Sequence, residues 1–257
     1  MSELLLSIKD NFIFVLEFLG IIVALFAIAY LAEWLHSKKE HTKLEVFTTR
    51  KICLTGLFSA LSFILMLFEF PLPFAPSFYK LDFSELPILI AAFAFGPVAG
   101  VMAEFVKILL NLLFTGTTTA FVGELANFAV GCSFILPASV FHLFAQKKKG
   151  ALLGVMIGTL TMTVFGTAFN ALYLLPKFAQ LYGMPLNALI GMGTAINPGI
   201  TNITTFVIFA VAPLNLIKGV ADSVVAMLIY IPLSPIIRFG TGHRNQHKIA
   251  DKTATTM

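Results

Sequence analysis

Long apolar runs separated by short polar segments make up most of the chain. A run of about 20 apolar residues is needed for a helix to cross the hydrocarbon core of a bilayer. The Gly96-Pro97 pair divides the longest run, because proline lacks a backbone N–H and restricts the residue before it. Pro213, Pro232 and Pro235 predict kinks or a shortened end in the last run. The pattern predicts seven helices, at about residues 12–35, 52–70, 84–95, 98–114, 120–145, 151–175 and 203–237.

The composition places these helices in a membrane. Hydrophobic residues make up 58% of the chain and charged residues 12%, and the mean hydropathy is +0.91. Soluble domains carry roughly 25% charged residues, so this chain has too little polar material to cover a soluble fold. We therefore expect an all-α polytopic membrane protein, with a lipid bilayer in contact with much of its surface.

Basic residues gather in three segments outside the apolar runs. Residues 37–51, residues 147–149 and the tail from residue 238 contain five, three and four lysines and arginines. Cytoplasmic loops of membrane proteins are enriched in these residues. Seven spans that start outside the cell place all three segments in the cytoplasm, with the N-terminus outside and the C-terminus cytoplasmic. This distribution also accounts for the net charge of +4, so we expect no nucleic-acid partner.

The chain lacks the common motifs of catalysis and metal binding. It has no GxxxxGK[ST], HExxH or GxSxG motif, and Cys53 and Cys132 belong to no CxxC or Cys/His cluster. We therefore expect a protein that is not an enzyme and has no catalytic residues, no metal and no cofactor. Two alternatives stay open: an intramembrane enzyme with Glu104 or Glu124 as a base, and a stand-alone secondary transporter, although no internal repeat is evident.

Several polar residues lie within the predicted spans and concentrate toward the outer half of the membrane. They are Glu124, Asn127, Asn170, Asn215 and Lys218. The loop at residues 71–82, with three prolines and three aromatic residues, would lie at the same level. Apolar walls with a few fixed polar groups are typical of small-molecule sites, and here they favour a flat, partly polar solute.

Each polar residue also has a purely structural interpretation. An intramembrane asparagine can join helices, and Lys218 can pair with Asp222 one turn further along. Glu104 and Lys107 are three residues apart and can neutralise each other.

Four segments resemble the S-components of energy-coupling-factor (ECF) vitamin transporters, and specifically the riboflavin-binding members of that family. They are EFPLPFAPSFYKLDFSELP at 69–87, TTTAFVGELANFAVGCSFILPA at 117–138, FNALYLLP at 169–176 and APLNLIKG at 212–219. With the hydropathy between them, the resemblance covers about residues 50–238. It implies a six-helix core in the bacterial cell membrane, which captures riboflavin from outside and delivers it inward with a transmembrane T-component and two ATP-hydrolysing subunits. An S-component for another vitamin remains the alternative within the family.

The resemblance also implies the binding residues. The loop at 71–82 would act as a lid, and the substrate-binding residues would be Tyr79, Lys80, Leu81, Asn127, Asn170, Asn215 and Lys218, with Glu124 as a further candidate. The T-component would contact small residues of the first core helix, here Gly56 and Ala60.

The resemblance divides the chain into three parts. Residues 50–238 would form the six-helix substrate-binding domain and residues 239–257 a basic cytoplasmic tail. Residues 1–49 would form an additional transmembrane helix and a basic cytoplasmic linker, which the family pattern lacks.

Overall fold

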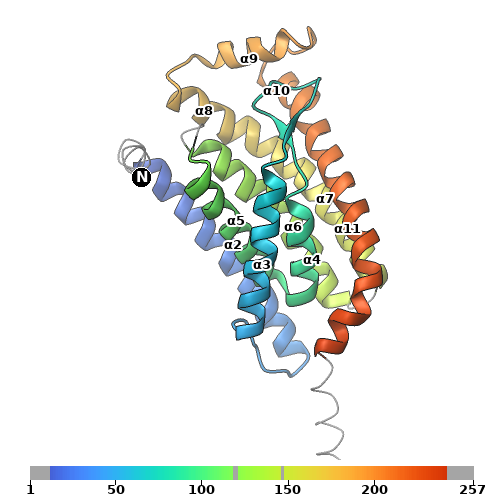
Figure 1. The fold of residues 1–257 in the computed structure, drawn as a ribbon. Coiled ribbons are helices and arrows are strands. Elements are labelled where there is room, and N and C mark those ends of the chain that lie inside the picture. Colours follow the sequence, from blue (N-terminus) through green and yellow to red (C-terminus); the bar gives the residue numbers. More distant parts are fainter. Residues whose placement is uncertain (1–11, 118–120, 146–147, 242–257) are drawn as a thin grey trace, which may run out of the picture.

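The apolar runs of the sequence form helices in the computed structural model, which describes residues 12–117, 121–145 and 148–241 (Figure 1). Most of the predicted basic tail, residues 242–257, lies outside the described residues, as does Lys147. The elements follow one another as α2 (Phe12–Lys39), α3 (Thr49–Met66), β1 (Phe70–Pro71), β2 (Lys80–Leu81), α4 (Glu85–Phe95), α5 (Pro97–Phe114), α6 (Val122–Ala145), α7 (Lys148–Phe169), η1 (Asn170–Leu174), α8 (Leu175–Leu181), α9 (Leu186–Thr194), α10 (Ile203–Phe206), η2 (Val207–Val211) and α11 (Ala212–Thr241).

Six helices of the described chain are long and apolar enough to cross a membrane. They correspond to six of the seven predicted spans, and the fold is the expected all-α polytopic one. The seventh prediction, at 84–95, forms the 11-residue helix α4, which is about 16 Å long and cannot cross the membrane by itself. Helix α4 is instead almost entirely buried within the bundle, and it ends at the Gly96-Pro97 break that the sequence predicted.

From α2 to α7, with the short α4 counted, successive helices run in opposite directions along the bundle (Figure 1). One end carries the β1–β2 hairpin, α8, α9 and the start of α2, and we call it the hairpin end. The other end carries the linker at residues 40–48, the junction of α6 with α7 and the end of α11, and we call it the linker end. The described parts of the three basic segments all lie at the linker end, so they share one side of the bundle as their charges predicted.

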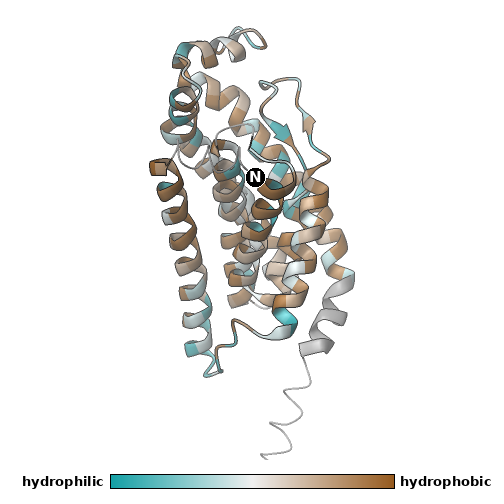
Figure 2. Cartoon of the chain, turned by 60° about the vertical axis from the view of Figure 1, so that its left-hand side comes forward, coloured by the Kyte–Doolittle hydropathy of each residue, from teal (hydrophilic) through white to brown (hydrophobic). Residues whose placement is uncertain are grey.

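The lateral surface between the two ends is apolar (Figure 2). Large hydrophobic side chains are exposed on every long helix, such as Ile13, Leu57, Leu113, Leu160 and Leu228. In water such a surface would cause aggregation, whereas lipid solvates it. On helix α3 the polar residues Thr55, Ser59 and Ser62 are buried in the bundle, whereas Leu57, Leu61 and Ile64 are exposed.

Two π-helical segments interrupt the last two long helices, and the sequence interpretation did not foresee them. Segment η1 ends two residues before Pro176, and η2 ends two residues before Pro213. Proline cannot donate the usual backbone hydrogen bond, and its ring crowds the carbonyl of the preceding turn. The wider turn accommodates this, because the amide of Leu175 bonds to the carbonyl of Asn170 and that of Ala212 to that of Val207. Such segments are frequent at functional sites.

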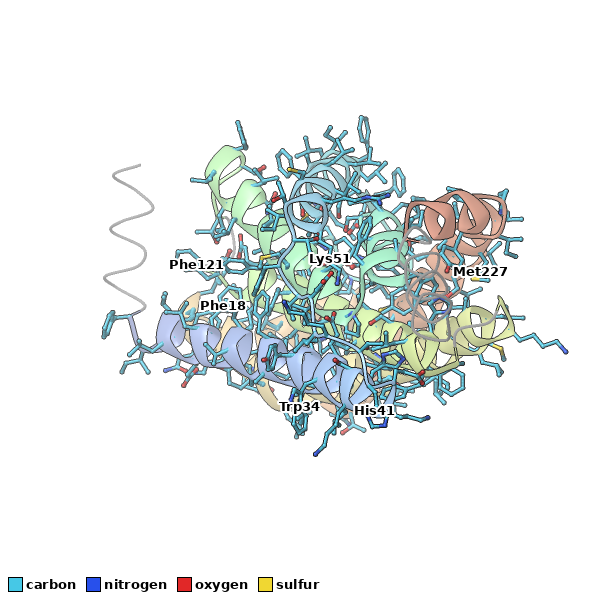
Figure 3. All side chains as sticks on the ribbon, turned by 90° about the horizontal axis from the view of Figure 1, so that it is seen from below. Phe18, Trp34, His41, Lys51, Phe121 and Met227 are labelled. Carbon is cyan, nitrogen blue, oxygen red and sulfur yellow. The ribbon has the colours of Figure 1, made fainter. Side chains whose placement is uncertain are left out.

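Helix α2 packs along one side of the bundle against α5 and α6 (Figure 3). Its inward side buries Phe14, Phe18 and Ala29, whereas Trp34 on its other side is 41% exposed. The buried Glu33 carboxylate accepts a hydrogen bond of 2.9 Å from the backbone N–H of Val98, in the first turn of α5. An anion is favourable at a helix N-terminus, so this contact fixes α2 to the α4–α5 junction.

Gly96 allows this close approach, and its replacement tests the junction. Its backbone has φ 103° and ψ 170°, a region that is essentially restricted to glycine, and a Cβ there would meet the Glu33 carboxylate. We expect Gly96→Ala to lower the free energy of unfolding, measured by SDS titration in mixed micelles, by about 1–3 kcal/mol. Gly20→Ala is the matched control, because a Cβ at Gly20 meets no atom within 4 Å. An equal effect of both substitutions would contradict this view of the junction.

Candidate functional site

A cavity lies toward the hairpin end, between the loop that contains the hairpin and helices α6, α8 and α11. Its polar lining comes from five elements: Lys80, Glu85, Asn127, Asn170, Asn215 and Lys218. Its apolar lining includes Phe78 and Phe178 on one side and Val130 and Met162 deeper in the bundle. The cavity therefore combines apolar walls with a small number of polar groups from distant parts of the chain.

Six of the eight residues proposed as substrate-binding line this cavity. They are Tyr79, Lys80, Asn127, Asn170, Asn215 and Lys218. The other two are buried outside its lining: Leu81 is part of β2, opposite Phe70, and Glu124 is in the first turn of α6. Gly123, the neighbour of Glu124, does line the cavity.

The loop at 71–82 covers the cavity and is held down by aromatic and polar contacts. The Tyr79 hydroxyl donates a 2.6 Å hydrogen bond to Asn170 Oδ1, while Asn170 Nδ2 donates to the Gly166 carbonyl one turn earlier. Phe78 stacks on Phe178 of α8, with ring centroids 5.3 Å apart. Burial raises the pKa of Tyr79 far above its ordinary value, so the phenol keeps its proton and stays a donor. The loop is thus closed over the cavity by contacts with η1 and α8.

A buried ionic network lies beside the cavity, and its first lysine is on α5. Lys107 Nζ is 2.7 Å from Glu104 Oε1, 3.0 Å from Glu85 Oε1 and 3.2 Å from the Ser84 hydroxyl. The side chains of Lys107, Glu85 and Glu104 are almost completely inaccessible to solvent. The predicted pairing of Glu104 with Lys107 is therefore present, with Glu85 as a second partner.

The second lysine of the network, Lys218 on α11, connects it to the loop. Lys218 Nζ is 3.0 Å from Asp82 Oδ2 and 3.5 Å from Glu85 Oε1. Burial alone would raise the pKa of Asp82, but Lys218, Lys107 and the hydrogen bonds from Ser84 outweigh it and hold that pKa below its usual value. The suggested pairing of Lys218 with Asp222 was wrong. The loop residue Asp82 lies within reach of the amine, and among the described residues Asp222 makes no ion pair or hydrogen bond.

Two of the cavity-lining residues each have a buried side-chain atom with no hydrogen-bond partner among the described residues, Oε2 of Glu85 and Nδ2 of Asn215. Both residues line the cavity and are at least 95% buried. An unpaired polar group in an apolar interior is costly, so a ligand that supplies an acceptor for Asn215 and a donor for Glu85 would be stabilised here. The arrangement fits reversible binding of a solute with both kinds of group.

Sequence reasoning identified Asn215 but missed Glu85. An acidic residue in the first turn of a helix is ordinary, because it complements the helix dipole, so Glu85 carried no distinctive signal by itself. The signal that could have identified Glu85 was its position, because it follows three residues after Asp82, the end of a loop predicted to lie at membrane level. Within the described residues no group of three or more His, Cys, Asp and Glu side chains could hold a metal ion.

Comparison with known proteins adds an independent finding. Residues 50–230 match the family described as ECF transporter, substrate-specific component. Riboflavin transporter FmnP of Bacillus subtilis (strain 168) is 33% identical over 189 residues, which are 73% of this chain and 94% of that protein. Riboflavin transporter RibU of Staphylococcus aureus (strain TCH60) is 35% identical over 196 residues, 76% of this chain and 96% of that protein.

A solved structure agrees with these sequence relatives. It is described as "Structure and mechanism of the S component of a bacterial ECF transporter", and it is 34% identical in sequence with a TM-score of 0.57. The likeness covers 73% of this chain and 97% of that one. Helix α2 ends at Lys39, before the residues that match the family begin.

The ionic network predicts a large effect of removing Lys107. In Lys107→Met the carboxylates of Glu85 and Glu104 lose their shared cation in a buried site. We expect the free energy of unfolding in mixed micelles to fall by about 3–5 kcal/mol, the usual effect of breaking a buried pair. Lys43→Met, at an exposed position of the linker, is the control and should change it by less than about 0.5 kcal/mol. A Lys107→Met protein as stable as the control would show that the network does not hold the fold.

Proposed function

Because this chain belongs to the family of ECF transporter substrate-specific components, we propose that it captures riboflavin and delivers it across the cell membrane as the binding subunit of such a transporter. Like its relatives, it is a transport component and not an enzyme. The observation that carries the proposal is the cavity, in which the buried donor Asn215 Nδ2 and the buried acceptor Glu85 Oε2 lack partners among the described residues. Two relatives that share this part of the chain are named riboflavin transporters.

The chemistry of riboflavin suits this cavity. Its isoalloxazine ring is flat and uncharged, and its faces favour aromatic and apolar walls such as those formed by Phe78, Phe178 and Met162. The pyrimidine edge of the ring presents carbonyl acceptors and one N–H donor. Asn215 can donate to such a carbonyl, and Glu85 can accept from the N–H or from a ribityl hydroxyl. Further amide groups are available along the lining.

Entry of the vitamin requires the loop at 71–82 to move. The bond between Tyr79 and Asn170 and the stacking of Phe78 on Phe178 would break, since both close the cavity on its hairpin side. Asp82 would stay in place, because its ion pair with Lys218 and its bond from the Ser84 amide anchor that end of the loop. The loop would then act as a lid that hinges at Asp82 and closes over the bound flavin.

The orientation follows from the positive charges. The linker end would face the cytoplasm and the hairpin end the outside, because basic loops are retained on the cytoplasmic side. The cavity and its lid would then receive riboflavin from outside, with the N-terminus outside and the C-terminus in the cytoplasm.

The energy for transport would come from a T-component and two ATP-hydrolysing subunits. Helix α3 is a suitable contact surface for the T-component. Gly56 is exposed there, a Cβ at its position would meet no atom within 4 Å, and Ala60 one turn further is half-buried. Small residues allow a neighbouring helix to approach closely. Residues 50–238 would form the binding domain, and residues 1–49 would add α2 and its basic linker.

Riboflavin titration of the purified chain, produced without partner subunits, tests this function. We expect flavin absorption bands in the purified protein or saturable binding at one site. Biotin and thiamine, titrated in the same way, should not compete. Saturable binding of another vitamin with no response to riboflavin would contradict the assigned substrate and leave the family unchanged.

Asn215 provides a sharper test of the site. Removing its amide in Asn215→Ala should weaken riboflavin binding by about 1–3 kcal/mol, which is about 5- to 150-fold in Kd, because a buried flavin acceptor is left without a donor. Asn187→Ala is the control, since Asn187 is exposed on α9 and outside the cavity lining. Equal affinities of Asn215→Ala and the unmodified chain would remove Asn215 from the site.

A further inference from the structure

Helix α2 reaches the cavity wall indirectly, through four residues that we call the Glu17 clamp: Phe14, Glu17, Tyr173 and Lys177. The Glu17 carboxylate accepts a hydrogen bond from the Tyr173 hydroxyl and lies 3.0 Å from Lys177 Nζ. Phe14, one turn earlier and 3% exposed, stacks on the Tyr173 ring with centroids 6.4 Å apart. The Lys177 amine lies 5.8 Å from the Phe14 centroid and 5.6 Å from that of Tyr173. An ion pair, a hydrogen bond and ring packing from α2 thus all act on Tyr173 and Lys177.

The clamp holds the π-helical segment that carries part of the cavity lining. Tyr173 belongs to η1 and Lys177 to α8, and the intervening Leu174 and Leu175 line the cavity. Asn170, at the start of η1, lines the cavity and holds the Tyr79 hydroxyl of the loop above it. A π-helical turn is a local departure from the regular α-helical hydrogen-bond pattern, and here Glu17 and Phe14 of α2 contact it through Tyr173.

Helix α2 can supply such support because it is fixed at both ends. Glu33, 16 residues and about 24 Å beyond Glu17, is bound to the first turn of α5, and Phe18 is buried between the two points. Neither Glu17 nor Tyr173 lines the cavity, so their effect on a ligand would pass through η1. The clamp also involves a helix outside residues 50–230, which are the residues that match the family.

We propose that Glu17 is a positioning residue of the binding site, which holds η1 in place and thereby slows release of the bound ligand. The ligand in this inference is riboflavin, so that part rests on the proposed function. When Glu17 is replaced, Tyr173 and Lys177 lose their shared partner and η1 gains conformational freedom. The hydrogen bond between Asn170 of η1 and Tyr79 of the loop at 71–82 then weakens. Helix α2 would then be an added brace that makes this chain retain its ligand longer than its six-helix core alone would.

The expected size of the effect follows from the solvent exposure of Glu17 and Lys177. The side chains of Glu17 and Lys177 are 39% and 24% exposed, so their ion pair contributes modestly, and the hydrogen bond from Tyr173 adds to it. We expect Glu17→Ala to speed riboflavin release by about three- to tenfold. Glu17→Gln retains an acceptor for Tyr173 and should lie between Glu17→Ala and the unmodified chain.

Two measurements on the full-length chain decide the question. Hydrogen–deuterium exchange of residues 170–177 without ligand reports directly on η1, and stopped-flow release of riboflavin reports on the consequence. Glu17→Ala should increase both the exchange rate of these amides and the rate of riboflavin release, and Tyr173→Phe should do the same. The double variant should match Glu17→Ala, because the hydrogen bond that Tyr173→Phe removes is already lost in Glu17→Ala. Glu40→Ala is the matched control just beyond the other end of α2, where the side chain is exposed, and it should change neither exchange at 170–177 nor release.

Each contrary result has a distinct meaning. Unchanged exchange in Glu17→Ala, or equal changes in Glu40→Ala, would overturn the clamp. Faster exchange with unchanged release would overturn its role in retaining the ligand. A chain that never binds riboflavin would overturn the proposed function, and the exchange data alone would still decide whether the clamp holds η1.

Discussion

The structure depends on neutralising charges that are buried in a membrane protein. Lys107 and Lys218 lie inside the bundle and share the carboxylate of Glu85, while Glu104 and Asp82 each neutralise one of them. Removing a charge from water is costly, and lipid offers no alternative partner, so these groups must meet in one arrangement. That arrangement joins α5, α11 and the start of α4 at the point where the loop after the hairpin enters the bundle.

The cavity is a consequence of this junction. Asp82 ties the loop to α11 beside Asn215, and Glu85 contributes one oxygen to the lysines while its other oxygen has no partner among the described residues. The opposite wall comes from η1, where a proline two residues beyond the segment imposes a wider helical turn. The site therefore combines one wall held by buried ion pairs with a second wall whose π-helical segment contacts α2 through Tyr173.

Much of this could be predicted from the sequence, because long apolar runs and basic loops are strong signals in a membrane protein. The break at Gly96-Pro97, the placement of the basic segments at one end and most of the polar residues that line the cavity followed from local chemistry or from the family resemblance. Tertiary contacts decided the rest. Lys218 has a neighbour of opposite charge on its own helix, yet it pairs with Asp82, which is 136 residues distant along the chain. Glu85, helix α9 and the two π-helical segments left no periodic signal that hydropathy could detect.

The central claim is that riboflavin occupies the cavity beside the ionic network, with its pyrimidine edge toward Asn215 and Glu85. An experimental structure of the purified full-length chain with riboflavin tests this most directly. The account predicts flavin density between α6, η1 and α11, with Asn215 Nδ2 within hydrogen-bond distance of a flavin acceptor and the Asp82–Lys218 ion pair intact. Flavin bound elsewhere, or bound in this cavity with Asn215 and Glu85 still unpaired, would contradict it.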